Sequence, residues 1–444
     1  QNQCSRLTRM GVQELPESVF KLCQNTQKIH RALISMLLLR PNPLPDESLE
    51  SYLIRLAELY SYTPNQLIGR FHIILNEKDQ KLTGALPTDI SRINLFHANI
   101  SSALRFQCLE LLAEKVCKGR LPILQLAVYR SRTKYAGSDK SLLWIGIDIP
   151  RRFFRKHIIP VCPACLAESE VPYIPQYWHL NIVRACPIHG CKLLEICPEC
   201  SEALNYMQTG NLESCACGAA YKTMPVEMAE EPLLSLAKVV SSHERDRCTS
   251  ENLLFTLEDI HQIFGAIVWF FLYVADEREI TDDSLLKCIS FFNRWPSQLD
   301  KLLENKFESA LECSDRLMSA TPFYSIFGNL LVISRNLPST AISYNPILKG
   351  IFNFLDRSIQ ANNRSSELGY LLLNGFEAGA LLDTTQEQIA RLLEEGRLHT
   401  NIRLKSQSSF ESSTPLFNLK DVFYLWLSGF QSRLSNRHLY LSEW

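Results

Sequence analysis

The stretch of sequence that decides the fold begins with Cys162-Pro-Ala-Cys165 and continues, after 20 intervening residues, with Cys186-Pro-Ile-His189. Eight of the 15 cysteines fall in the window from Cys162 to Cys217, far more than an even spread would place there. A close pair directs two ligand atoms to one point, and a second pair completes the tetrahedral shell that zinc prefers. We therefore predict a first zinc site with Cys162, Cys165, Cys186 and His189 as its ligands.

A second group of thiols follows directly. It reads Cys197-Pro-Glu-Cys200, 14 intervening residues, and then Cys215-Ala-Cys217. These four thiolates predict a second zinc ion, although the second pair is tighter than a CxxC pair. Cys191 lies between the two groups and is close enough in sequence to replace one ligand. The preferred assignment leaves Cys191 free.

Two other interpretations of these cysteines are ordinary buried thiols or disulfides, and redox chemistry at one CxxC pair. Pairs in series within a chain that carries no secretory signal favour metal binding over both. A shell filled by four protein ligands is typical of structural zinc, because catalytic zinc keeps one position open. The HxE and HExxH spacings of zinc hydrolases and the glycine-rich loops that bind nucleotides are absent from the sequence. We expect a protein that is not an enzyme.

Composition sets the broad class. The chain has 444 residues, of which 46% are hydrophobic and 21% charged, and its formal charge is −1. This length predicts two to four domains, and the balanced charge excludes a generic polyanion binder. The longest apolar stretch, 263–275, is too short to cross a bilayer as a helix, and no secretory signal is recognisable. We expect a protein of the bacterial cytoplasm.

The fold class that the sequence predicts is mainly α-helical and multidomain. In the segment after Pro45, Leu49, Leu53, Leu56 and Leu59 recur at helical spacing. Pro64 then opens a second helix, so the two form a helix-turn-helix arrangement that either packs structurally or reads DNA. We divide the chain into an extension (1–35), an N-terminal domain with this helix-turn-helix and a basic segment (36–160), a zinc-knuckle or zinc-ribbon region (161–222), an acidic linker (223–249) and a C-terminal helical domain (250–444).

Basic residues concentrate just before the first cysteine pair. Between Lys118 and Lys156 there are ten Lys or Arg and only two Asp. Such a segment either neutralises phosphates or is a solvated face. The candidate contacts to nucleic acid or a partner are Arg130, Arg132, Lys134, Arg151, Arg152, Arg155 and Lys156.

A second helix-turn-helix is predicted near the end of the chain. Thr384 as N-cap, with Glu387 three residues later, predicts a helix that Gly396 ends. Its exposed side chains would be Gln386, Gln388 and Arg391, which suit base or partner contacts without being diagnostic of them.

The order of these motifs resembles the TniQ family of transposition target-selection proteins. The resemblance covers about residues 36 to 444. It is carried by the helix after Pro45, Pro87-Thr-Asp-Ile-Ser-Arg-Ile-Asn94, the first zinc motif with Tyr177-Trp-His179, Phe291-Phe-Asn-Arg-Trp-Pro296, Gln388-Ile-Ala390, Asp421-Val-Phe-Tyr-Leu-Trp-Leu427 and Trp444. Residues 1–35 and Cys191 have no counterpart in the family pattern. The length and ending look most like TniQ of type I-F CRISPR-associated transposons.

This resemblance implies a non-catalytic adaptor. Such a protein forms a homodimer, docks on the guide-RNA complex Cascade, recruits the AAA+ ATPase TnsC and contacts target DNA only indirectly or weakly. A TnsD-like selector that binds one attachment site directly is the alternative within the family. A zinc-dependent nucleic-acid enzyme is a remote third hypothesis.

Overall fold

The computed structural model describes residues 41–98, 102–116, 122–241, 251–275, 277, 279–313, 317–361, 364–401 and 411–434. The predicted extension 1–35, Lys118, Arg120 and Trp444 therefore lie outside the described residues. The chain forms two compact units, which we call the N-terminal unit and the large unit. The N-terminal unit runs up to Val128 and also contains Tyr173–Pro175 and Tyr206–Leu212, whereas the large unit contains the rest. The first unit thus ends earlier than the domain boundary placed at 160.

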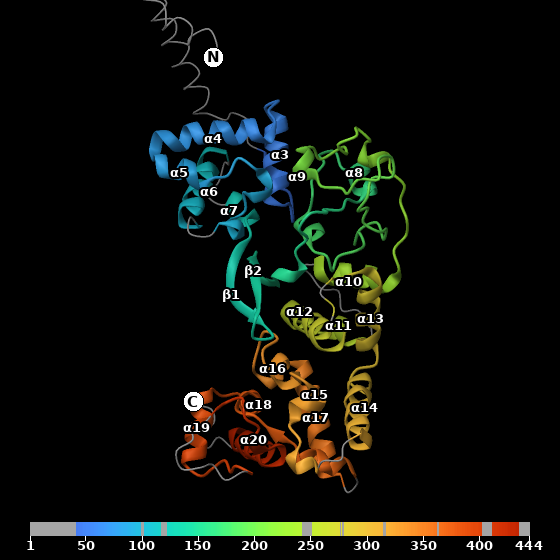
Figure 1. Ribbon diagram of the computed structural model, residues 1–444. Helices are drawn as coiled ribbons and strands as arrows, with labels where there is room; N and C mark the ends of the chain where they lie inside the picture. The colour runs from blue at the N-terminus through green and yellow to red at the C-terminus, as the bar shows by residue number, and fades with distance from the viewer. Residues whose placement is uncertain are drawn as a thin grey trace, which may run out of the picture. The chain divides into compact units, whose positions relative to one another are not determined.

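Helices build the N-terminal unit (Figure 1). They are α3 (Leu49–Leu59), α4 (Pro64–Lys78), α5 (Gln80–Ala85), η1 (Ile90–Arg92), η2 (Leu95–His97), α6 (Ser102–Val116), α7 (Pro122–Leu126) and the short α9 (Tyr206–Thr209). The side chain of Ser48 caps α3, and Thr63 with Gln66 forms a capping box at the start of α4. The two expected helices are confirmed, but Leu59 is 44% exposed and does not join the apolar face.

A buried polar network anchors the start of α3. Glu47 is fully buried and accepts hydrogen bonds from Arg55, at 2.7 Å, and from the Ser51 hydroxyl, at 3.2 Å. The Ser51 hydroxyl in turn accepts from the backbone of Ile174, and Ser48 shares a 2.8 Å hydrogen bond with the Tyr206 hydroxyl. Because an unpaired buried polar group is costly, this network fixes segments from the middle of the sequence in the N-terminal unit.

The large unit starts with a three-stranded antiparallel sheet in the order β1-β2-β3, formed by β1 (Tyr129–Tyr135), β2 (Asp139–Trp144) and β3 (Ile147–Pro150). A bulge interrupts the pairing of β1 with β2 between Arg130 and Lys134. The short η3 (Arg151–Phe153) follows, and Phe153 meets Phe264 edge to face. The basic segment therefore contains a sheet, which the sequence analysis did not predict.

The cysteine-rich part of the large unit has little regular structure. It contains α8 (Pro163–Glu168), η4 (Gln176–His179) and η5 (Tyr221–Thr223), joined by isolated bridges such as Val161 with Leu194. Part of the predicted acidic linker is helical instead, because α10 (Glu231–Ser241) buries Leu233, Leu236 and Ala237. These apolar residues recur at helical spacing, a signal that the acidic composition masked.

The rest of the large unit is helical, as expected. Its elements are α11 (Leu253–Thr256), α12 (Ile260–Trp269), the π-helical η6 (Phe270–Val274), α13 (Asp282–Asn293), α14 (Ser297–Cys313), η7 (Met318–Ala320), α15 (Phe323–Phe327), α16 (Leu330–Ser334), η8 (Ile342–Tyr344), α17 (Pro346–Gln360), η9 (Arg364–Tyr370), β4 (Leu372–Leu373), α18 (Gly375–Leu381), α19 (Gln386–Glu394), β5 (Phe417–Asn418) and α20 (Leu419–Leu434). Strand β4 pairs with β5. Among the described helices, none has the length and hydropathy needed to cross a bilayer.

Helix α19 begins one residue later than expected. Its N-cap is Thr385, whose side chain forms no capping hydrogen bond, whereas the backbone N–H of Thr384 donates to Gly379. The prediction of a capping box from Thr384 to Glu387 is therefore wrong. The close approach of the α18–α19 turn to Gly379 fixes Thr384 in the turn. The expected end of the helix is confirmed, since Gly396 has a φ of +68°.

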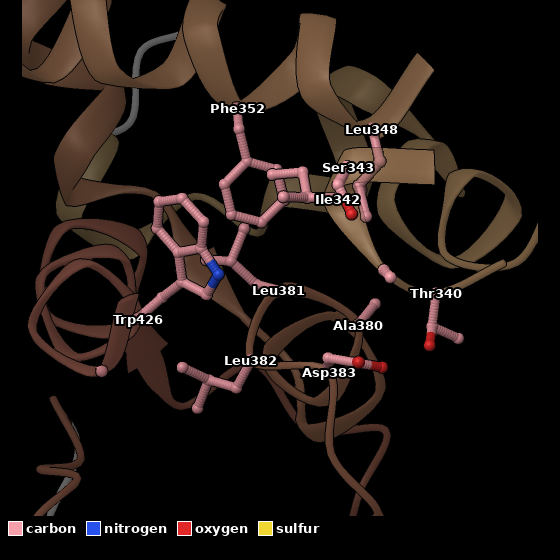
Figure 2. A pocket seen from close by; sticks show the side chains of 12 residues that line it. Thr340, Ile342, Ser343, Leu348, Phe352, Ala380, Leu381, Leu382, Asp383 and Trp426 are labelled. Carbon is pink, nitrogen blue, oxygen red and sulfur yellow. The ribbon is translucent and has the colours of Figure 1, made fainter. Parts of the chain in front are cut away.

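A cavity of about 180 Å³ lies beside the first half of α17 and the middle of α20. Phe352 and Trp426 line its apolar side, with their ring centroids 4.2 Å apart, and Leu381 lies below them (Figure 2). Thr340 and Asp383 stand at its polar side.

Candidate metal centres

The first cysteine group converges on one point. Cys162 is the N-cap of α8 and Pro163 occupies the first helical turn, so the chain turns sharply and the Cys165 N–H donates to the Cys162 sulfur at 3.4 Å. The His189 N–H makes the same contact with the Cys186 sulfur, also at 3.4 Å. These two similar turns present the four predicted ligands to each other, and their ligand atoms all lie within 4.8 Å of one another.

The distances fit a tetrahedral metal site. A zinc–sulfur bond of about 2.3 Å in a tetrahedron places sulfurs about 3.8 Å apart and a ligating nitrogen about 3.6 Å from each sulfur. The Nδ1 atom of His189 lies 3.7, 3.1 and 3.5 Å from the sulfurs of Cys162, Cys165 and Cys186. The sulfurs of Cys165 and Cys186 are 3.4 Å apart.

Glu168 orients the histidine ligand. At the end of α8, its carboxylate accepts a hydrogen bond from the Nε2–H of His189 at 2.9 Å. This bond places the proton on Nε2 and leaves Nδ1 as the lone-pair donor that faces the sulfurs. Desolvation lowers the pKa of His189, but the hydrogen bonds to Glu168 and Cys186 outweigh it and raise the pKa.

The second group, Cys197, Cys200, Cys215 and Cys217, is closer to ideal geometry. The sulfurs of Cys197 and Cys217 are 3.8 Å apart, as are those of Cys200 and Cys215. The tight second pair reaches the site because Gly218 adopts a φ of +89° and its N–H donates to the Cys215 carbonyl. The cluster lies nearer to solvent than the first, with Cys217 exposed. Both clusters could thus hold a metal ion, consistent with two zinc sites.

The thiolate is the metal ligand, and in each cluster one thiol is acidified while its neighbours hold their protons. The pKa values of Cys162, Cys165, Cys200 and Cys215 are raised. Hydrogen bonds from the thiols of Cys162 and Cys165 lower the pKa of Cys186 to about 2. Desolvation raises the pKa of Cys197, but hydrogen bonds from the backbone of Cys200 and Glu199 and from neighbouring thiols outweigh it and lower the pKa to about 7.

Cys191 lies beside the first cluster rather than within it. Its side chain is fully buried, and its sulfur is 3.4 Å from that of Cys162. Its carbonyl accepts a hydrogen bond from the Cys186 N–H at 2.7 Å, which positions the second pair of ligands. The four-ligand cluster is complete without Cys191.

A network of ion pairs supports the segment between the clusters. Arg155 and Arg184 both donate to Oε1 of Glu195, at 2.5 and 2.7 Å, and Arg184 also pairs with Asp282 at 3.2 Å. Arg155 further donates to the carbonyl of Val183. Desolvation lowers the pKa of Arg155, and Glu195 opposes that shift. Arg155 is therefore a structural cation, which corrects its place among the candidate contacts.

Sequence reasoning missed Arg184 and Glu195. They lie between the metal motifs with ordinary surface composition, and no local pattern indicates that they pair with each other.

His179 lies apart from both clusters. Burial and the nearby Arg155 lower its pKa to about 3, so it is neutral. Its carbonyl accepts a hydrogen bond from the Arg155 N–H at 2.8 Å, and the neighbouring Trp178 is fully buried. The geometry supports a packing role for this pair of residues.

The other candidate contact residues are spread over the large unit. Arg130, Arg132 and Lys134 are the exposed side chains of β1, and Arg151 and Lys156 are also exposed. Arg152 pairs with Asp139 at 2.8 Å and is less accessible. On α19, Gln386 donates to the Gly375 carbonyl, Gln388 is half-buried and Arg391 is exposed. The structure does not bring these sets together into one site.

One comparison with known proteins bears on this arrangement. The TniQ family model matches residues 38–193, which include α3, the three-stranded sheet and all four ligands of the first cluster. No curated protein matches the chain. The match covers about a third of the sequence, so residues 38–193 are similar to the TniQ family.

Proposed function

We propose that this protein is a non-catalytic adaptor that selects the target in RNA-guided DNA transposition. The observation that carries the proposal is the TniQ match over residues 38–193, because TniQ proteins select transposition targets. In the finer form of the proposal, the protein docks as a homodimer on the Cascade–guide RNA complex. It then recruits the AAA+ regulator TnsC, which brings the transposase to the target DNA.

The chemistry of the clusters is compatible with an adaptor. Each cluster offers four protein ligands, so a tetrahedral zinc ion bound there would have no open position for water or substrate. Zinc at these positions would supply folding free energy, because the part around the clusters has few regular elements of its own. The metals would thereby fix the surface that partners recognise.

Co-expression with the partners tests the proposal. The tagged full chain would be produced with type I-F Cascade subunits, a guide RNA and TnsC, and the purified complex would be analysed by mass and by metal content. We expect stoichiometric Cascade, two copies of this chain and two zinc ions per chain. The absence of Cascade, together with a discrete footprint on chromosomal DNA, would contradict the proposal and favour the TnsD-like alternative.

Two cysteine variants make this experiment specific. Cys186→Ser removes a ligand of the first cluster. The variant should therefore bind one zinc ion fewer per chain and should no longer recruit the partners. Cys313→Ser is the matched control, because Cys313 is exposed and lies outside both clusters. Recruitment by a soluble Cys186→Ser protein that has lost this zinc would show that the first cluster does not form the partner surface.

A further inference from the structure

We propose that the exposed cations of the first hairpin bind the phosphodiester backbone of a nucleic acid directly. We call these residues the basic hairpin surface: Arg130, Arg132 and Lys134 on β1, Lys140 on β2 and Arg151 on η3. The proposal goes beyond the proposed function, in which partner proteins deliver the chain to DNA. It depends on the charges and geometry of the hairpin alone.

Strand geometry spaces the cations on β1. Exposure alternates along the strand, so Arg130, Arg132 and Lys134 are exposed while Tyr129, Ser131 and Thr133 are half-buried. Every second residue of a strand recurs at about 6.6 Å, which is about twice the axial rise per phosphate of one nucleic-acid strand. A row of three cations can therefore follow a phosphate backbone, as β-ribbons that bind nucleic acid do.

A like-charge pair marks the end of this row. Lys134 and Lys140 are direct cross-strand partners in the antiparallel pair, and both are exposed. Like charges placed opposite each other destabilise a sheet, so the fold maintains this pair at a cost. The bulge between Arg130 and Lys134 lies beside it, and bulges commonly redirect side chains next to functional sites. An anion bound between the two lysines would remove the repulsion.

The two carboxylates of the sheet have partners other than the lysines at the end of the row. Asp139 pairs with Arg152 at 2.8 Å and is 19% exposed. Asp148 accepts a hydrogen bond from the Thr133 hydroxyl at 2.8 Å on the half-buried side of β1. Among the described residues of the three strands these are the only two acidic ones, against four basic ones.

The hairpin is held in place from within the large unit, which preorganises the cations. At its tip, the Ala136 N–H donates to the Asn336 carbonyl at 2.5 Å, and the Asn336 side chain donates to the Lys134 carbonyl at 3.2 Å. The buried Tyr135 hydroxyl donates to the Asp148 carbonyl at 2.7 Å. These bonds hold the backbone on both sides of Lys134. Binding a polyanion then requires little ordering of the chain.

Protection of an edge strand is the competing explanation. Strand β1 is at the edge of the sheet, and lysines on edge strands prevent pairing with other chains. A negative charge would protect the edge equally well, whereas only a positive charge binds phosphate. A variant in which lysines are replaced by glutamates should therefore stay monomeric under both explanations but lose nucleic-acid binding only under the proposal.

Binding would be measured by fluorescence anisotropy with the full-length, metal-replete protein. The probes are a labelled 30-base-pair DNA duplex and an RNA hairpin of similar charge, each titrated from 50 to 200 mM salt. The test variant combines Arg132→Ala, Lys134→Ala and Lys140→Ala. The logarithm of the duplex binding constant falls linearly with the logarithm of the salt concentration, with a slope of about 0.9 per phosphate contact. Loss of three contacts should therefore reduce the magnitude of this slope by about 2.7. Lys134→Arg with Lys140→Arg should retain binding.

Control variants exclude general charge and folding effects. Lys222→Ala, Lys301→Ala and Lys349→Ala together remove the same charge from other exposed positions and should leave the slope unchanged. Lys134→Glu with Lys140→Glu should abolish binding while the protein remains monodisperse with an unchanged melting temperature. Stronger binding of the duplex or of the RNA identifies the source of the phosphates, and either supports the proposal.

Three results would overturn the proposal. The first is that the unmodified chain binds neither probe. The second is that the salt dependence of binding is unchanged in the test variant, and the third is that the control variant loses as much of this salt dependence as the test variant. The test is distinct from that of the proposed function, because recruitment of partner proteins can be measured after nuclease treatment. A test variant that loses nucleic acid but keeps its protein partners supports the hairpin proposal and leaves the adaptor proposal intact.

Discussion

Glu168→Ala should weaken metal binding at the first cluster and leave the second cluster unchanged. The carboxylate accepts the Nε2–H of His189 at 2.9 Å, which holds Nδ1 toward the three sulfurs. Loss of such an outer partner typically costs 10- to 100-fold in metal affinity. Because the Glu168 side chain is 72% exposed, water can replace part of its role. We therefore expect a loss of metal affinity at the low end of this range, which is about tenfold, or about 1.4 kcal/mol of binding free energy.

The assay exploits the different ligand sets of the two clusters. Cobalt bound by three sulfurs and one nitrogen absorbs at different wavelengths from cobalt bound by four sulfurs, so a chelator titration resolves the two sites. Glu170→Ala is the matched control, because Glu170 is exposed, two residues away and outside both clusters. Equal weakening of both clusters, or the same titration for both variants, would refute the argument that Glu168 orients His189.

Three further predictions concern stability. Gly265→Ala should destabilise the fold by about 3 kcal/mol in urea unfolding, because the added Cβ would lie 2.1 Å from the Leu337 carbonyl oxygen. A cost below about 1 kcal/mol would contradict this packing. Burial raises the pKa of Glu377 to about 7, so the folded state holds its proton more tightly and stability should fall as pH rises from about 4.5 to about 7, by at most about 3 kcal/mol. Glu377→Gln should flatten that pH dependence in melting temperatures, and an unchanged profile would argue against it. Glu195→Gln should cost about 3 kcal/mol, because it leaves Arg155 buried without its counter-charge, and Glu195→Asp should cost less in the same unfolding assay.

The candidate metal ligands could be predicted because their information is local. Two residues between paired ligands are enough to define a turn, and the N–H to sulfur contacts at Cys162 and Cys186 follow from it. The helix-forming regions could be predicted for a similar reason, since apolar periodicity and capping residues such as Thr63 act over one or two turns.

Charged residues whose environment is set by distant partners could not be predicted. Glu47 and Arg155 look like surface charges in the sequence, but both side chains are buried and pair with Arg55 and Glu195 respectively. Arg155 also lies in a basic run whose other members are more exposed. No local signal separates a cation that solvent surrounds from one that a carboxylate 40 residues away neutralises. The sheet was overlooked for a related reason, because charged side chains dominate the exposed positions of β1 and hide its alternation.

The interleaving of the two units limits how this protein can be divided or recombined. Between Cys165 and Cys186 the chain supplies Tyr173–Pro175 to the N-terminal unit, and between Cys200 and Cys215 it supplies Tyr206–Leu212. A fragment that ends at 160 would therefore lack Tyr206 and expose the fully buried Ser48 that bonds to it. Exchange of the N-terminal unit between related proteins would have to include the two segments that the cysteine-rich region supplies to it, so a single cut in the sequence cannot separate the two units.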